Sequence, residues 1–307
     1  MNIKLLTPSA GLLFAFLFSA GAQNLYVSCW NGGLGYGTIA SVAAGGSVNT
    51  FASGLYDPMG LAFDGAGNLF EVDTGNGSGG YINKFTAAQV GSGGGSPTVF
   101  ASGFLNPYGL VFDGTGNLYE ADQSSGDSLH VFTPSASETT ISLGHNPGQI
   151  AFDGAGNLYI ANISRGNLSI LSSGGSLNDY AYSFSGHPYG LAFDKSGNLF
   201  VSSDTGDIYE YLGGNISSGS PITFATGLNN PAGLTFDGAG DLFVADSGSG
   251  HLFEFQNNDG TLSSTPVTYA SGLGHPTFMA FGPAVPEPSI LALAGLGAIS
   301  FLHRRRR

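Results

Sequence analysis

Short apolar runs separated by polar and glycine-rich turns recur along most of this chain. In the copy that follows Pro58, the strand-like runs cover residues 60–63, 68–72, 81–85 and 98–102. Runs of four to five residues rich in Phe, Leu, Val and Tyr favour β-strands over helices. The turn between the first two runs contains Asp64, Gly65 and Gly67, which suit a tight hairpin. We therefore predict four strands per copy, with Pro58 in the loop before the first because proline cannot donate to a ladder.

Copies of this pattern follow one another about every 40 to 49 residues, aligned on the phenylalanine of a Phe-Asp pair. The five full copies contain Phe63, Phe112, Phe152, Phe193 and Phe236. A proline lies five residues before each, namely Pro58, Pro107, Pro147, Pro188 and Pro231. A period of this length with four strands is typical of a β-propeller blade.

A sixth copy is split between the two ends of the repeat region. It begins with Pro276 and Phe281 and then stops, whereas residues 23–29 (QNLYVSC) match the half that is missing. An open solenoid has no reason to split a repeat between its ends. Pairing these two halves, however, would close a ring and remove the open sheet edges. The sequence thus predicts an all-β fold, a six-bladed β-propeller of four-stranded blades closed by a split blade.

The repeat resembles the NHL family, whose pattern is matched by Pro231, Gly233, Leu234 and Phe236-Asp237, followed by Asp241 to Asp246. The resemblance covers nearly all of residues 23–283 and implies a propeller. Members of that family range from binding modules to lyases, so the resemblance does not assign a function.

The two ends of the chain resemble targeting segments. Residues 1–22 have a lysine, an apolar stretch and a small-x-small site, which is typical of a cleaved signal peptide, with an uncleaved anchor as the alternative. Residues 284–307 combine a Pro286-Glu287-Pro288 triplet, an apolar run over 289–302 and a basic end. The basic end consists of Arg304, Arg305, Arg306 and Arg307.

The C-terminal pattern resembles the PEP-CTERM sorting signal of Gram-negative bacteria. That resemblance implies an exosortase as partner and delivery to the periplasm, the outer envelope or the extracellular matrix. The apolar run would extend ~21 Å as a helix, less than the ~30 Å hydrocarbon core. We expect transient insertion of this short transmembrane helix in the inner membrane, with the arginines inside; a permanent C-terminal anchor is the alternative.

The charge of the chain limits which classes of partner are expected, and its cysteine content limits which covalent bonds are possible. Without the two end segments, three basic residues face 20 acidic ones, a net charge of about −17. Nucleic-acid binding needs a basic surface, so DNA and RNA are not expected as partners. Cys29 is the one cysteine, which rules out an internal disulfide, and its strand position indicates a buried small residue.

Candidate site residues flank the repeat prolines, where propeller symmetry places one segment per blade at one mouth of the channel. The preceding residue is polar in all six copies: Asp57, Asn106, Asn146, His187, Asn230 and His275. With His145, this ring could bind a divalent metal, or the side chains could simply cap the turn. In four copies, the residue after the proline is Met59, Tyr108, Tyr189 or Thr277. These side chains could form a rim that binds a ligand, or they could pack within their loops.

Carboxylates also mark the second predicted strand. Glu71 and Glu120 occupy a position that holds Val or Ile in the other copies, which favours a metal ligand or general base, an exposed strand edge, or a hydrogen bond to a loop. The polar residue that closes this strand is given a structural role by the NHL resemblance, as an acceptor from neighbouring turns. These closing residues are Asp73, Asp122, Asn162, Asp204 and Asp246.

Three hypotheses for function follow. The first is an exported, non-catalytic binding or structural module without a cofactor, whose ligand is a polysaccharide or an envelope protein. The second is a metal-dependent lyase or lactonase at the channel mouth, with ligands among His145, His187, His275 and Asp57, and with Glu71 or Glu120. The third is a matrix filler selected for solubility.

Overall fold

The computed structural model describes residues 23–31, 36–75, 79–123, 126–180, 185–217 and 220–284. The signal peptide predicted over 1–22 and the apolar run predicted over 289–302 lie outside these residues. Residues 23–283 form one compact unit. Within the described residues, no helix is both long enough and apolar enough to cross a membrane.

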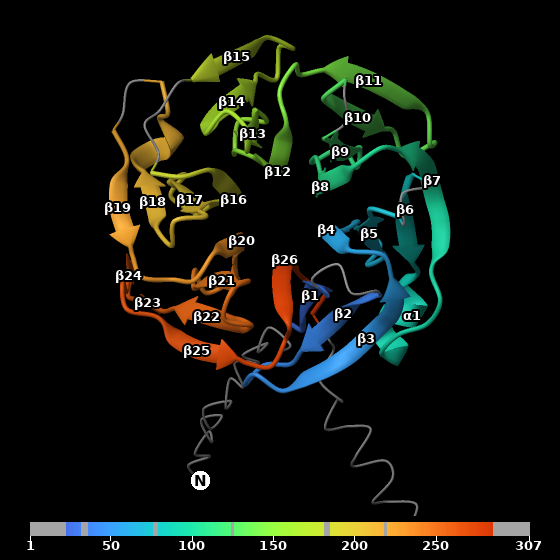
Figure 1. Cartoon of the computed structure of the whole chain (residues 1–307), viewed down its shortest axis with the longest axis horizontal. Coiled ribbons are helices and arrows are strands. Elements are labelled where there is room, and N and C mark those ends of the chain that lie inside the picture. The colour runs from blue at the N-terminus through green and yellow to red at the C-terminus, as the bar shows by residue number, and fades with distance from the viewer. Residues whose placement is uncertain are drawn as a thin grey trace, which may run out of the picture. The chain divides into compact units, whose positions relative to one another are not determined.

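Six four-stranded antiparallel sheets surround a central axis, which confirms the predicted propeller (Figure 1). Blade 1 contains β26 (His275–Phe281), β1 (Leu25–Trp30), β2 (Gly37–Val42) and β3 (Val48–Leu55). Blade 2 contains β4 (Pro58–Phe63), β5 (Leu69–Asp73), β6 (Gly80–Phe85) and β7 (Thr98–Phe104). Blade 3 contains β8 (Pro107–Phe112), β9 (Leu118–Asp122), β10 (Ser128–Phe132) and β11 (Glu138–Ser142).

The second half of the ring repeats this order. Blade 4 contains β12 (Pro147–Phe152), β13 (Leu158–Asn162), β14 (Asn167–Leu171) and β15 (Leu177–Tyr180). Blade 5 contains β16 (Pro188–Phe193), β17 (Leu199–Ser203), β18 (Ile208–Tyr211) and β19 (Ile222–Ala225). Blade 6 contains β20 (Pro231–Phe236), β21 (Leu242–Asp246), β22 (His251–Phe255) and β25 (Val267–Ala270).

Three short elements lie outside this repeat. They are α1 (Ala87–Ser92), η1 (Leu212–Gly214) and the small hairpin of β23 (Asn257–Asn258) and β24 (Thr261–Leu262). The repeat pattern did not predict the helix. Thr86 and Gln89 form a capping box at its start and Gly93 ends it in a left-handed conformation, so local capping alone accounts for this one turn and a half.

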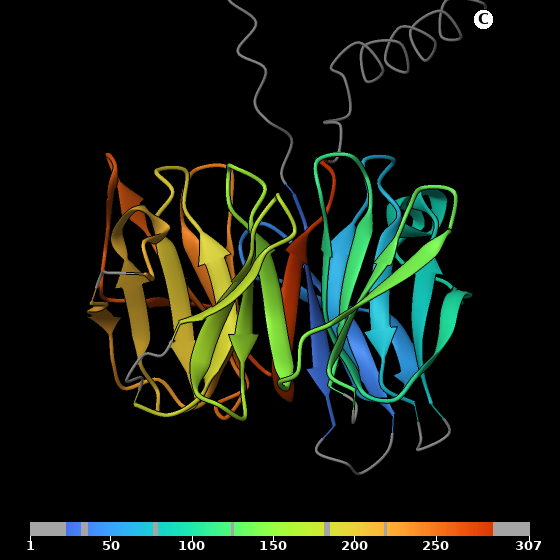
Figure 2. The same ribbon diagram turned by 90° about the horizontal axis from the view of Figure 1, so that it is seen from above.

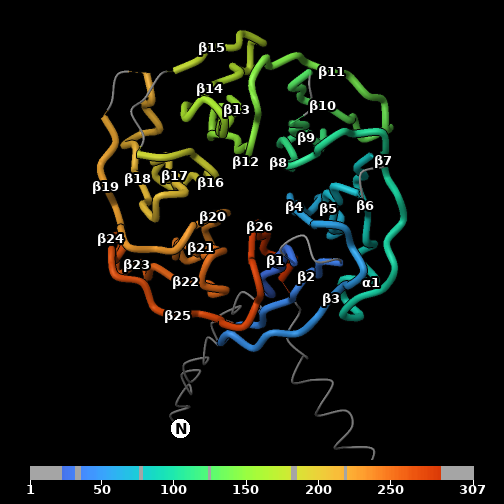
Figure 3. Tube along the Cα trace, viewed as in Figure 1, coloured from blue at the N-terminus to red at the C-terminus, as the bar shows by residue number. Residues whose placement is uncertain are grey.

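The ring closes through the split blade (Figure 3). Strand β1 pairs with β26, with Leu25 opposite Phe281 and Trp30 opposite His275, and on its other side it pairs with β2. The chain ends of the propeller therefore meet, and the Gly282 N–H donates to the Asn24 carbonyl at 2.9 Å. This arrangement confirms the prediction that the N-terminal segment completes the C-terminal half-blade.

One prediction about the inner strands is wrong in detail. Pro58 and its five counterparts were expected in the loop, but each lies within the strand, as the first residue in five blades and the second in β26. Pro58 lies opposite Asp73, and the register then shifts before Leu61 opposite Glu71. A proline is tolerated at a strand start and beside a bulge because no ladder N–H is required there.

Aromatic contacts repeat around the whole ring and build the core between blades. The phenylalanine that ends each inner strand packs edge-on against an aromatic ring from the second strand of the preceding blade, with centroids 4.9–5.3 Å apart. The pairs are Phe63–Tyr26, Phe112–Phe70, Phe152–Tyr119, Phe193–Tyr159, Phe236–Phe200 and Phe281–Phe243. Two of the six pairs involve the split blade, so closure completes the aromatic ladder.

Candidate functional site

The propeller has two faces, which the side view in Figure 2 separates. We call the face with the Asp-Gly turns after the inner strands, such as residues 64–68, the hairpin face. The opposite face, formed by the residues directly before the inner strands and by the turns after the second strands, is the loop face. Residues Asn24 and Gly282, where the chain enters and leaves the ring, both lie at the hairpin face.

On the hairpin face, the repeated aspartates are used by their own turns. Asp64 accepts hydrogen bonds from Ala66 N at 3.0 Å and Asn68 N at 2.9 Å, while Gly67 adopts φ 82°. The same pattern recurs at Asp113, Asp153, Asp194 and Asp237. These carboxylates hold the turn and its left-handed glycine in place.

On the loop face, the closing aspartates have the structural role that was predicted for them. Asp122 accepts from Leu105 N at 3.0 Å and from Asn106 N at 2.9 Å. Asp73, Asp204 and Asp246 likewise accept from the backbone before their own inner strands. Asn162 differs, because its amide donates to Ser169 Oγ at 2.7 Å.

The three histidines of the predicted metal ring each have a partner of their own. His187 Nδ1 lies 2.8 Å from Asp204 Oδ2, and His275 Nδ1 lies 3.0 Å from the Ser247 carbonyl. His145 is buried, with Nε2 3.1 Å from both Ser169 Oγ and Asp179 Oδ1. Among the described residues, no three His, Cys, Asp or Glu side chains are grouped so that they could hold a metal ion. A divalent metal stays a prediction.

The polar residues before the prolines all lie on the loop face. Asp57 and Asn230 adopt left-handed backbone conformations, with φ 46° and 60°. Asn106 donates to Gln123 Oε1 at 3.1 Å, so it caps its neighbouring turn. By contrast, Asp57 Oδ1 and Asn146 Oδ1 are buried atoms that no described residue meets with a hydrogen bond.

Two of the predicted rim residues enter the channel. The Tyr108 ring on β8 meets the Phe278 ring on β26 edge-on at 5.2 Å, and the inner strand β4 lies between these two strands in the ring. The contact therefore crosses the channel. Burial raises the pKa of the Tyr108 phenol far above its usual range, and the phenol of Tyr189 from blade 5 adds to the shift.

The other two rim candidates pack inside the protein. Met59 joins the apolar cluster between blades 2 and 3, and Thr277 Oγ1 lies 2.9 Å from Ser28 Oγ in a buried pair. The inner strands also approach one another closely at this end. A Cβ on Gly190 would lie 2.2 Å from the Ala232 carbonyl oxygen, which only glycine avoids.

Toward the hairpin face, the channel contains a cavity of about 390 Å³ that is lined by the inner strands alone. Gln149 and Thr235 supply its polar side chains, and the backbone of the inner strands supplies further polar surface. Gln149 Oε1 already accepts from Leu191 N at 2.9 Å.

Glu71 and Glu120 are fully buried, so the expectation of an exposed strand edge is wrong for both. Glu71 Oε2 accepts from Asn83 Nδ2 at 3.0 Å, and Glu120 Oε1 accepts from Tyr108 N at 3.3 Å. Burial raises the pKa of Glu71 to about 8, and it raises that of Glu120 well above its usual range. The charge of Asp73 adds to the shift at Glu71, so this carboxyl group is mostly protonated at neutral pH.

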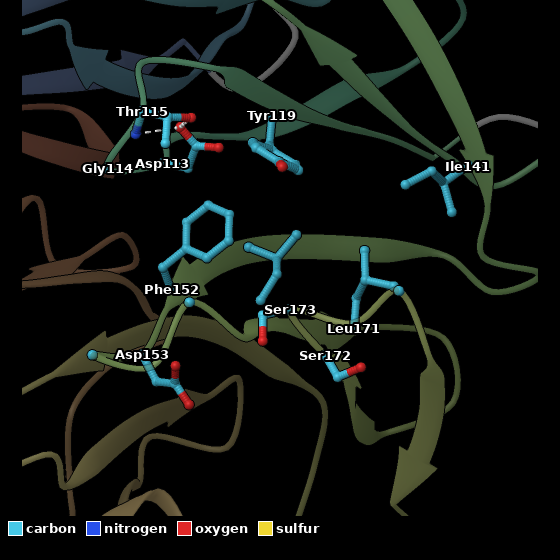
Figure 4. Close-up of a pocket in the computed structure, with 14 residues that line it drawn as sticks. Asp113, Gly114, Thr115, Tyr119, Ile141, Phe152, Asp153, Leu171, Ser172 and Ser173 are labelled. Atoms are coloured by element: carbon cyan, nitrogen blue, oxygen red, sulfur yellow. Dashed lines mark hydrogen bonds between the residues drawn. The ribbon is translucent and has the colours of Figure 1, made fainter.

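A cleft of about 690 Å³ opens between blades 3 and 4 on the hairpin face (Figure 4). Its walls include Tyr119, Ile141, Phe152 and Leu171. The aspartates at its rim, Asp113 and Asp153, belong to the turns described above, so they are committed to backbone N–H groups. A similar cleft of about 700 Å³ lies between blades 5 and 6, which indicates that such gaps arise where neighbouring blades diverge.

Three aromatic residues on the loop face were missed from the sequence: Trp30, Tyr36 and Tyr56. They lie at the junction of blades 1 and 2: Trp30 ends β1, Tyr36 directly precedes β2, and Tyr56 lies on the segment before β4. The rings of Tyr36 and Tyr56 are 4.6 Å apart, and Trp30 lies 5.7 Å from the His275 ring. In the sequence, Trp30 could have been noticed because it is the single tryptophan and directly follows the repeated segment 23–29. Nothing in the repeat indicated that Tyr36 and Tyr56 meet.

Solved structures with the same fold include two kinds of enzyme. A streptogramin B lyase matches with a TM-score of 0.61 and 15% identity over 84% of this chain and 92% of that one. The virginiamycin B lyase of Staphylococcus aureus gives 0.58 and 14% over 82% and 84%. A gluconolactonase of Xanthomonas campestris gives 0.60 and 15% over 80% and 87%. At these identities the likeness concerns the fold. No curated protein matches the chain by sequence.

Residues 284–307 match the PEP-CTERM protein-sorting motif. The motif implies an exported protein that an exosortase sorts to the cell envelope. The chain is thus a six-bladed β-propeller followed by a PEP-CTERM sorting motif, and its fold is shared with lyases and a lactonase.

Proposed function

We propose that this protein is an envelope-sorted β-propeller that acts as a non-catalytic binding module through its loop face. The observation that carries the proposal is a difference between two sets of side chains. The repeated polar residues make hydrogen bonds within the scaffold, whereas unrepeated aromatic and polar residues lie on the loop face. Gly282, where the chain leaves the ring, lies on the hairpin face, so the loop face is on the other side of the ring from that point.

The main support against catalysis at the channel mouth is the state of the ionisable groups. His187 and His275 are engaged with Asp204 and Ser247, and the two glutamates with raised pKa values are enclosed between strands. A general base must come within hydrogen-bonding reach of its substrate. Glu71 and Glu120 are fully buried, and Tyr108 and Phe278 occupy the channel. Neither carboxyl group therefore meets that condition.

One observation keeps a metal-dependent lyase or lactonase as the second candidate. The fold neighbours named above are enzymes of these two kinds, and His187 is exposed on the same face as Asp57 and His275. A metal could recruit such side chains by rearranging their loops, as neutral imidazole and carboxylate are suitable ligands.

Metal content and envelope binding separate the two candidates. Residues 23–283, purified and dialysed against a chelator, should contain no stoichiometric metal and should still bind envelope fractions at unchanged affinity. One metal ion per chain, lost in His187→Ala and His275→Ala together with the bound fraction, would favour the enzyme. Leu212→Ala, at an exposed site on the hairpin face, is the control for handling losses.

A further inference from the structure

We propose that Trp30, Tyr36, Tyr56 and Asp57 form a binding site for a neutral polysaccharide on the loop face. This inference rests on the proposed function and specifies the ligand class and the residues. The four side chains come from blade 1 and from the segment that enters blade 2, so they lie at the junction of these two blades.

The tyrosine pair presents an aromatic surface to solvent. The Tyr36 and Tyr56 rings are tilted by 57° at a centroid distance of 4.6 Å, and Tyr56 Oη donates to Tyr36 Oη at 3.0 Å. Tyr36 is 56% exposed. Asp73 holds the Tyr56 backbone through a 3.0 Å hydrogen bond, so this surface is anchored on the scaffold.

Asp57 supplies a carboxylate beside these rings. Burial raises the pKa of this carboxyl group, the Trp30 side chain nearby opposes the shift, and the Trp30 ring is tilted against His275. Oδ1 of this carboxylate is buried and has no hydrogen-bond partner among the described residues, so a ligand hydroxyl group reaches it only by displacing the atoms that cover it. Asp57 adopts a left-handed φ of 46°, as the equivalent Asn230 does with φ 60°.

This combination matches the two chemical surfaces of a sugar ring. The C–H face of a pyranose packs on an aromatic ring, and its hydroxyl groups donate to a carboxylate. Tyrosine and tryptophan provide both a wide apolar face and a polar edge, and they lose little side-chain entropy on binding. The net charge of about −17 on residues 23–283 repels polyanions, which favours an uncharged polysaccharide over an acidic one.

The other five blade junctions lack this set. The residue pairs that correspond to Tyr56-Asp57 are Leu105-Asn106, His145-Asn146, Gly186-His187, Asn229-Asn230 and Gly274-His275. None of these pairs contains a tyrosine or tryptophan. The aromatic surface is therefore a local departure from the six-fold repeat, as expected for a site that binds one ligand segment.

The single tryptophan gives a direct readout. Residues 23–283 should be titrated with neutral glucans (dextran and laminarin) and with the polyanion alginate, while Trp30 fluorescence and bound fraction are followed. We expect a saturable change in Trp30 emission with at least one neutral glucan and none with alginate. Tyr36→Ala should weaken binding by roughly tenfold, and Asp57→Asn by several-fold.

Two exposed leucines provide matched controls. Leu105→Ala on the loop face, 66% exposed, and Leu212→Ala on the hairpin face, 61% exposed, should bind as the wild type does. Because Tyr36 is exposed, its variant should retain the wild-type melting temperature, so weaker binding would reflect the site and not unfolding.

Three outcomes would overturn the inference. Glucan binding that leaves Trp30 emission unchanged and survives Tyr36→Ala would place the ligand elsewhere, while leaving a binding function intact. Binding of neither glucan would exclude the ligand class, even if an envelope protein bound this surface. Turnover of a lactone or a streptogramin that depends on bound metal would contradict the proposed function itself.

Discussion

The two faces of the propeller are built from the same repeat, but their side chains have different roles. On the hairpin face, five aspartates make the same hydrogen bonds to their own turns, so the blades are nearly interchangeable there. On the loop face, closing aspartates hold the backbone before the inner strands, but the side chains presented differ in every blade. The comparison teaches that this chain separates stability from recognition: uniform residues hold the ring, and exceptions to the repeat supply its surface chemistry.

The largest expected effect comes from breaking the ring on which both faces depend. Deletion of residues 23–29 removes most of β1, which pairs with β26 and β2 and buries Leu25 and Val27 completely. We expect loss of the cooperative thermal transition, because two sheet edges and the aromatic ladder are opened at once. Calorimetry of the deleted and intact chains measures this effect. A retained cooperative transition would show that closure is not required.

A smaller loss is expected from removing one step of the aromatic ladder. Phe200 is 2% exposed and contacts both Phe224 and Phe236 at 5.2 and 5.3 Å. Phe200→Ala should lower the free energy of unfolding by about 3–5 kcal/mol, through lost burial and the cavity left behind. Denaturant titration gives the value. Phe200→Leu, which keeps most of the volume, should cost clearly less, and equal losses would argue against a packing role.

The next prediction concerns a buried exception to the repeat. The pKa of Glu71 is about 8 in the folded protein, above the unfolded value of 4.5. The folded state therefore binds the proton more tightly, and Glu71 lowers stability progressively as pH rises from about 4.5 to 8. Glu71→Gln keeps the acceptor for Asn83 and removes the charge. It should raise the free energy of unfolding by a few kcal/mol at pH 8.5 and change it little at pH 4.

Chemical unfolding of the wild type and the variant across this pH range tests the Glu71 prediction. The difference between the two curves isolates this group from all others that titrate. Asp259→Asn is the control, because Asp259 is exposed and its left-handed φ of 51° suits asparagine. A constant difference between pH 4 and 8.5 would show that folding does not raise the pKa of Glu71.

The smallest effect on stability is expected on the loop face. Tyr36→Ala removes an exposed ring and one hydrogen bond between hydroxyl groups, so the free energy of unfolding should change by about 0.5 kcal/mol or less. Thermal melting measures this value beside Phe200→Ala. A loss of 2 kcal/mol or more at Tyr36 would remove the distinction between scaffold and recognition residues.

The sequence by itself determined the number of blades, the four strands in each and the split blade, while the structural role of the closing aspartates was implied by the NHL resemblance. Local hydrogen bonds and a period of two along each strand carry that information, so one repeat predicts the next. The same pattern placed the candidate ring of polar residues on one face, as the structure shows.

Only the tertiary structure decided which side chains meet across the ring. Closure brings Trp30 and His275 together from opposite ends of the chain, and it lets Tyr108 touch Phe278 across the channel. The fold of blade 1 and its exit segment places Tyr36 beside Tyr56, and the packing of the sheets buries Glu71 and Glu120. These contacts depend on packing between residues far apart in sequence, which a repeat pattern does not encode. The repeat thus predicts the scaffold, and its folding decides the site.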